Sequence, residues 1–200
     1  AGTAGLTAYR EAKRVSDKVL LIHKGLFGTT CARVGCMPSK VLIQVADDYY
    51  RRKVFTLEGI LGADRLTVDI PQVLKHVRSL RDRFVRAVMG GMESFREEII
   101  LGEAKYISPQ KIKIANQTIS CKKSIIATGS TPSIPIECKP FEEDILTTDS
   151  FFEQEDLPTT MAVLGSGVIG LELGQALSRL GIQTSILGRS ERLAGLTDPI

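Results

Sequence analysis

Apolar and polar residues follow three different patterns along the chain. Short apolar runs, such as those at 18–22 and 161–164, predict buried strands. Between 71 and 98 an apolar residue recurs every three or four positions, which predicts one long amphipathic helix. Isoleucines alternate with lysines at 111–114, which predicts a strand with one exposed face. Buried strands mixed with amphipathic helices indicate the α/β class.

A glycine turn, an amphipathic helix and a short apolar run follow one another twice. The last glycine of the turn is Gly5 in the first copy and Gly170 in the second. In both copies that glycine lies 18 positions before the residue that ends the second apolar run, His23 or Gly188. This order is typical of the opening of a Rossmann unit.

The second copy is complete, because the apolar run 161–164 precedes a full G-x-G-x-x-G motif. The motif consists of Gly165, Ser166, Gly167, Val168, Ile169 and Gly170. Its glycines allow a tight turn and let backbone N–H groups approach a pyrophosphate, while the positive end of the following helix favours the anion. The motif therefore predicts dinucleotide binding.

The first copy retains only the end of its turn: Gly2, Thr3, Ala4 and Gly5. The preceding strand and the first glycine would stand before Ala1. We therefore expect a chain truncated at its N-terminus, and also at Ile200, soon after the second strand of the second copy.

Two cysteines, Cys31 and Cys36, stand just after the first copy with four residues between them, and Pro38 predicts a helix that runs to about residue 52. A helix N-terminus stabilises a thiolate, so the pair is expected to be reactive and to exchange with disulfides. The alternatives are a zinc site, which usually has a shorter ligand spacing, and inert thiols. Cys121 and Cys138 are expected to be bystanders.

Residues 28–40 resemble the redox-active motif of the class I pyridine nucleotide-disulfide oxidoreductases, and the Cys-Met-Pro-Ser-Lys ending is most similar to that of the dihydrolipoamide dehydrogenases. Three further motifs follow in the order of that family. They are 102–106, similar to the segment that contacts the adenine of FAD, 124–130, similar to the strand end with Ala-Thr-Gly beside FAD, and 165–170.

The resemblance implies a role for each matching residue. Cys31 would attack the disulfide substrate, Cys36 would exchange electrons with the flavin, and Lys40 near the flavin would pair with Glu172. The residues implied to bind FAD are Gly2, Thr3, Ala4, Gly5, His23, Lys24, Thr29, Thr30, Lys40, Ala104, Ala127, Thr128 and Gly129. Those implied to bind NAD(P) are Gly165, Gly167, Val168, Ile169, Gly170, Glu172 and Arg189. No metal ligand is implied.

Two positions depart from the pattern of the family. The residue that reads the ribose in the first copy is normally acidic, but here it is His23, followed by Lys24. In the second copy the matching residue is Gly188, followed by Arg189. A missing carboxylate and an adjacent guanidinium favour a 2′-phosphate, so we expect NADPH rather than NADH.

The resemblance implies a Rossmann-like FAD-binding domain with an inserted, interrupted NAD(P)-binding Rossmann domain of the three-layer ββα type. The expected FAD domain covers 1–152 with a small antiparallel sheet, and 153–200 begin the NAD(P) domain. The His-x4-Glu pair that serves the family as acid and base is absent, since neither His23 nor His76 has the matching glutamate. This chain alone is therefore expected to be inactive.

Composition excludes several other classes. Apolar residues make up 43% of the chain, charged residues 24%, and the net charge is +3 with both signs dispersed. These values exclude disorder and favour neither nucleic acid nor a membrane as partner. We expect a cytoplasmic protein, and the resemblance implies a homodimer.

The predicted function is transfer of electrons between NAD(P)H, FAD and the Cys31–Cys36 pair, with a small lipoamide-like disulfide as substrate. A dihydrolipoamide dehydrogenase is the main hypothesis. The alternatives are an NADPH-dependent enzyme like glutathione or mercuric reductase, a soluble transhydrogenase, and an inactive flavin-binding fragment.

Overall fold

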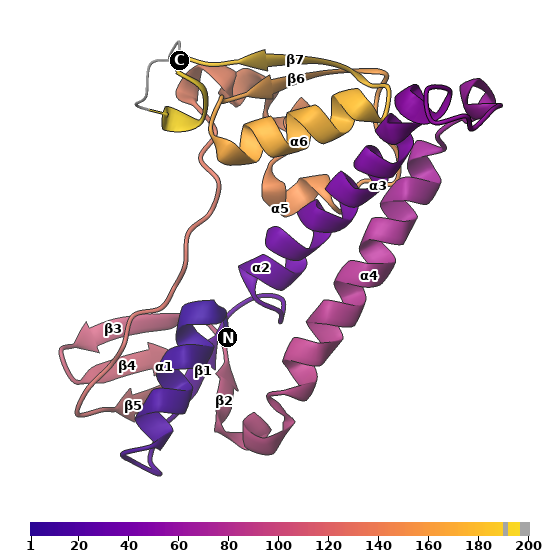
Figure 1. Ribbon diagram of the computed structural model, residues 1–200. Helices are drawn as coiled ribbons and strands as arrows, with labels where there is room; N and C mark the ends of the chain where they lie inside the picture. The colour runs from indigo at the N-terminus through magenta and orange to yellow at the C-terminus, as the bar shows by residue number, and fades with distance from the viewer. Residues whose placement is uncertain (190–191, 197–200) are drawn as a thin grey trace. The chain divides into compact units, whose positions relative to one another are not determined.

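The computed structural model describes residues 1–189 and 192–196 in an α/β arrangement (Figure 1). The chain divides into two compact units. Unit 1 contains residues 1–33 and 82–145, and unit 2 contains residues 34–81 and those from 146 onward.

A parallel pair of strands and one helix form the centre of unit 1. Helix α1 (Thr3–Lys13) leads to β1 (Leu21–His23), which pairs in parallel with β2 (Ile99–Leu101). The amide of Gly102 extends this pairing by donating to the carbonyl of His23 at 2.8 Å. The core of the unit consists of Ala1, Leu6, Tyr9, Leu21 and Met92.

A three-stranded antiparallel sheet completes the strands of unit 1, in the order β3 (Ala104–Ser108), β4 (Lys111–Ile114) and β5 (Gln117–Ser120). The alternation at 111–114 predicted β4 correctly, since Ile112 and Ile114 are buried and the lysines are exposed. Strand β3 was not predicted, because its residues are all exposed and show no alternating burial.

Unit 2 is built on the parallel strands β6 (Thr160–Leu164) and β7 (Gln183–Leu187), with α6 (Val168–Arg179) along one face (Figure 1). Helix α3 (Cys36–Phe55) packs on α6 and shares its core. That core consists of Leu42, Ala46, Leu74, Val77, Phe151, Phe152, Leu157, Ala176, Leu177, Leu180 and Ile182. Because of this shared core, the compact units differ from the division expected at residue 153.

The long helix ends earlier than the expected 71–98. Helix α4 covers Ile70–Gly90, and a 3-10 segment, η2 (Glu93–Glu98), follows it. Adjacent glycines at 90 and 91 disfavour a continued α-helix. The apolar spacing persists because Met92 still packs into the core of unit 1. Helix α3 is longer than the expected 38–52 at both ends.

The segment 124–130 was expected to end a strand, and this expectation is wrong for the structure described. Residues 121–135 form no regular element, and Ile125 and Ile126 are 68% and 72% exposed. A strand needs a neighbour to satisfy its backbone groups, and none pairs with this segment among the described residues.

Short elements connect these parts. They are α2 (Thr30–Arg33), η1 (Ala63–Arg65), η3 (Ile136–Asp144), α5 (Thr148–Phe151) and η4 (Leu193–Gly195). Within the described residues, no helix is both long and apolar enough to cross a membrane.

Candidate functional site

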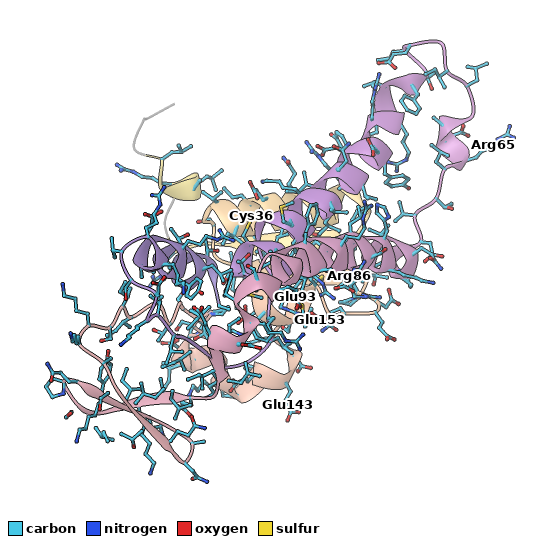
Figure 2. All side chains as sticks on the ribbon, turned by 90° about the horizontal axis from the view of Figure 1, so that it is seen from below. Cys36, Arg65, Arg86, Glu93, Glu143 and Glu153 are labelled. Atoms are coloured by element: carbon cyan, nitrogen blue, oxygen red, sulfur yellow. The ribbon has the colours of Figure 1, made fainter. Side chains whose placement is uncertain are left out.

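The two cysteines stand at the starts of consecutive helices. Cys31 is half-buried in α2, whose first turn is capped where the hydroxyl of Thr29 accepts a hydrogen bond from the amide of Ala32 at 3.1 Å. Cys36 is exposed and is the first residue of α3 (Figure 2). The first N–H groups of this 20-residue helix have no partner within the helix and can donate to a sulfur atom at that position. The arrangement therefore supports a reactive Cys36.

One turn after Cys36, the same face of α3 carries Lys40. Its Nζ lies 2.9 Å from Oε1 of Glu172, which α6 contributes. The structure thus brings together the lysine and the glutamate singled out from the sequence, 132 positions apart. Their side chains are 61% and 39% exposed, so solvent weakens the pair and leaves Lys40 accessible. Its role beside a flavin remains a prediction.

The first glycine turn leads into α1, and the space beside its N-cap is open. Gly2 is the N-cap, and a Cβ at this position would meet nothing within 4 Å. Thr3 and Ala4 are exposed in the first turn. A Cβ at Gly5 would lie 3.6 Å from Leu21 and 3.8 Å from Ala127, so the structure brings Ala127 next to the turn. Open space at a helix N-terminus fits the pyrophosphate of FAD.

His23 ends β1, where the ribose-reading residue was expected. Its Nδ1 lies 2.7 Å from the backbone nitrogen of Ala1, and its ring stacks on Phe27 with centroids 4.7 Å apart. Burial lowers the pKa of His23. A neutral imidazole offers a single acceptor nitrogen, so it does not replace a carboxylate toward both ribose hydroxyls.

An acidic residue that the sequence analysis missed lies close by. Glu103 accepts from Lys24 at 3.2 Å, and this hydrogen bond lowers the pKa of Glu103. Since β1 and β2 are parallel, their carboxyl ends meet, and the residues just after them become neighbours. The sequence signal that could have identified Glu103 is its position two residues after the apolar run at 99–101. It is also adjacent in sequence to Ala104, which is exposed.

The last position of the second glycine turn has no space for a side chain. A Cβ at Gly170 would overlap the carbonyl oxygen of Gly165, which itself has a left-handed φ of +118°. At Gly167, the N-cap of α6, a Cβ would meet nothing within 4 Å. Val168 and Ile169 are exposed in the first turn. The cradle therefore fits a dinucleotide pyrophosphate.

The remaining expected residues lie in exposed positions. Arg189 is exposed two residues after β7, and Gly188 before it provides no carboxylate. Thr30 is exposed at the start of α2. Thr128 and Gly129 are exposed in the irregular segment, and the structure brings neither to a described partner. Among the described residues, no group of three or more metal-binding side chains is found.

Comparison with known proteins gives one consistent result. The family model described as "Pyridine nucleotide-disulphide oxidoreductase" matches residues 1–200. The chain is 32% identical to a mercuric reductase of Lysinibacillus sphaericus, covering 99% of this chain and 36% of that protein. It is 34% identical to a dihydrolipoyl dehydrogenase of Geobacillus stearothermophilus, covering 98% of this chain and 42% of the relative.

The fold resembles that of the HOCl-induced flavoprotein disulfide reductase RclA from Escherichia coli, solved as a Cu(II) complex. The TM-score is 0.78 at 20% identity, over 98% of this chain and 42% of that one. The α/β class expected from the sequence is confirmed. In each of these comparisons the chain spans less than half of the matched protein.

Proposed function

Since the chain belongs to the pyridine nucleotide-disulphide oxidoreductase family, we propose that it is part of an enzyme that passes electrons between NAD(P)H, FAD and the Cys31–Cys36 pair. The observation that carries the proposal is the first turn of α3. There an exposed cysteine at the helix start precedes a lysine held by a glutamate of α6. The family uses FAD and NAD(P)H, and both glycine turns have the open N-cap that a pyrophosphate requires.

The cysteines perform the sulfur chemistry of the proposal. The Cys31 thiolate attacks one sulfur of the substrate disulfide, forms a mixed disulfide and releases the other sulfur as a thiol. The thiolate of Cys36, which is exposed at the start of α3, then attacks the sulfur of Cys31. This closes the Cys31–Cys36 disulfide and releases the second substrate thiol.

The other residues bind and orient. When bound, FAD would supply the two-electron chemistry that links the nicotinamide to the cysteine pair. Gly2–Gly5 would take its pyrophosphate, and Lys40, held by Glu172, would keep a positive charge near Cys36. The turn from Gly165 to Gly170 would take the pyrophosphate of NAD(P)H.

The preferred nicotinamide cofactor in this proposal is NADPH. Arg189 is exposed just beyond β7, and Gly188 leaves no carboxylate to repel a 2′-phosphate. A bidentate guanidinium–phosphate contact would then select NADPH. The second candidate is an NADPH-dependent enzyme like mercuric reductase, to which the exposed Arg189 is equally suited. Three of the similar proteins bear the name mercuric reductase.

For the substrate we propose a small disulfide of the lipoamide type, in line with the dihydrolipoyl dehydrogenases among the similar proteins. We also propose a cytoplasmic location and a homodimer for the whole protein. A transhydrogenase is less well supported, because the cysteine pair is intact.

A visible absorption spectrum of the purified chain, with added FAD and then NADPH or NADH, tests the flavin part. Retention of FAD after ultrafiltration supports the proposal, and a chain that retains none contradicts it.

For the cysteines, rates of thiol alkylation are compared between the chain and Cys36→Ser, with Cys121→Ser as matched control. The fastest-reacting thiol should disappear only with Cys36→Ser, since Cys36 is exposed. Loss of this thiol in the Cys121→Ser variant, or in neither variant, would refute the assignment.

A further inference from the structure

One face of the antiparallel sheet in unit 1 carries three lysines, of which Lys105 also interacts electrostatically with Glu103. The strand register places Lys105 directly opposite Lys113, and Lys111 lies two residues along β4 on the same face. Like charges directly opposite one another destabilise a sheet. None of these three exposed lysines is in an ion pair or hydrogen bond within the described residues. An anion on this face would relieve the repulsion.

Lysine alone supplies this charge. Between residues 97 and 178 the sequence has no arginine, and its six lysines are Lys105, Lys111, Lys113, Lys122, Lys123 and Lys139. Arginine is the residue favoured where phosphate is recognised in a planar, bidentate way. A surface of lysines offers point charges that attract carboxylates, and a chain of net charge +3 lacks the strong positive field typical of nucleic-acid binding.

The outer edge of β5 is open. The amide of Cys121 donates to the carbonyl of Gln110 at 2.9 Å, which marks these two as a hydrogen-bonded pair. In an antiparallel ladder the pattern alternates, so the backbone groups of Thr118 and Ser120 point away from β4. Both residues are exposed, and no partner is described for their outward groups.

The two edges of the sheet differ. On β3 the register shifts between Tyr106 and Ser108, an irregularity that protects an edge against pairing. On β5 the register is continuous from Gln117 to Ser120, with neither a proline nor a lysine in the strand. Only β5 is therefore suited to accept another strand.

We propose that the edge of β5 binds an extended acidic segment of a partner protein by strand addition. Thr118 and Ser120 share the face of Lys113 and Lys111. Alternate side chains of an added strand would lie beside these two hydroxyl residues, within reach of the lysines in the next strand. Carboxylates at those positions match the charge of the face, while main-chain hydrogen bonds along β5 position the segment.

The test uses the whole chain and a fluorescein-labelled peptide of about eight residues, long enough for one strand, in which glutamate and threonine alternate. Fluorescence anisotropy should detect binding that weakens as salt rises. The triple variant Lys105→Gln, Lys111→Gln, Lys113→Gln should weaken binding about tenfold. The matched control, with glutamine at Lys18, Lys75 and Lys139, should bind as the unchanged chain does.

Strand addition is separated from simple charge attraction by two further comparisons. Thr118→Pro removes an outward N–H without touching the pairing to β4, and should weaken binding about fivefold, whereas Thr118→Val should not. The same peptide with N-methyl groups on alternate amides keeps its charge and should lose most of its binding.

Three outcomes would overturn the proposal. The first is equal binding of the N-methylated peptide, which needs no variant to fold. The second is equal or tighter binding of an oligothymidylate of the same charge, which would make the face a general polyanion site. The third is self-association in sedimentation that Thr118→Pro abolishes, which would make a second copy of the chain the occupant.

Discussion

The two glycine turns can be compared residue by residue, because their helices begin in the same way. Helix α1 starts at Thr3 and α6 at Val168, each two positions before the last glycine of its turn. The N-caps, Gly2 and Gly167, have nearly the same extended backbone, with φ of −86° and −74°. The backbone geometry at the start of the helix is therefore nearly the same in the two turns.

The packing behind the two helices differs. Four positions after the last glycine, α1 carries Tyr9, which is buried and stacks on Phe95 with centroids 4.3 Å apart. The same position of α6 is Gly174, where a Cβ would lie 2.8 Å from Cδ1 of Ile186 on β7. Backbone requirements determine the turn, whereas the space behind the helix is filled by a large ring in one unit and by a close strand in the other.

The largest effect is expected at the last glycine. Gly170→Ala should lower the free energy of unfolding by about 3 kcal/mol, because the new Cβ meets a backbone carbonyl that has no room to move. Gly5→Ala should change it by less than about 1 kcal/mol, since its contacts are at ordinary distances and alanine favours the helix. Urea unfolding followed by circular dichroism measures both. Equal losses would show that the two turns are equally strict.

A smaller effect is expected behind α6. Gly174→Ala should cost about 1–2 kcal/mol, less than at Gly170, because the atom it meets is the end of a flexible side chain. Ile186→Val removes that Cδ1 atom, so the double variant should recover part of the loss relative to the sum of the single variants. Strictly additive losses in urea unfolding would contradict this account of the packing.

Tyr9, which packs behind α1, makes the free energy of unfolding depend on pH in the alkaline range. Burial, together with the hydrogen bond from its hydroxyl to Glu98, raises the pKa of Tyr9 from 10.0 to about 12. The folded state therefore favours the protonated phenol, a contribution that is complete below pH 10 and is lost as pH rises toward 12. The free energy of unfolding should fall over this range more steeply than in Tyr9→Phe. Parallel curves for the two proteins would rule out this role.

The smallest effect concerns Glu172, two positions after the last glycine of the second turn. The residue at the same position of the first turn is Thr7, whose hydroxyl donates a hydrogen bond to the carbonyl of Thr3 at 3.0 Å. A double-mutant cycle with Lys40→Gln and Glu172→Gln should give a coupling of about 0.5 kcal/mol that salt screens. A coupling above about 1.5 kcal/mol, unaffected by salt, would mean that the pair is a structural element.

Elements with a clear period could be predicted from the sequence. The glycine turns, the positions of β6 and β7 and the lysine–isoleucine strand follow from local patterns that the structure bears out. The burial expected of the apolar run at 161–164 is wrong, since the residues of β6 are half-buried or exposed. The pairing of Lys40 with Glu172 was reached through a family resemblance, and the structure places the two side chains in contact. The roles assigned to the site residues stay predictions.

Other features depend on long-range contacts that a local pattern does not reveal. The family resemblance implied a strand end at 124–130, but no neighbouring strand pairs with this segment among the described residues. Helical spacing continued past residue 90, because Met92 and Phe95 bury on the same core without an α-helix. Glu103 was missed because its partner, Lys24, is brought near only by the pairing of β1 with β2.

Gly167 and Gly170 lie three residues apart, yet the fold constrains them differently. The fold itself does not require glycine at 167, where φ is ordinary and the space beside the Cα is empty, and a serine there would even be a better helix cap. A library of variants sorted for folding alone should therefore accept substitutions at 167 and reject them at 170. Sorting the same library for retention of a nucleotide should reject both, so the difference between the two sorts separates positions kept for the fold from those kept for a ligand.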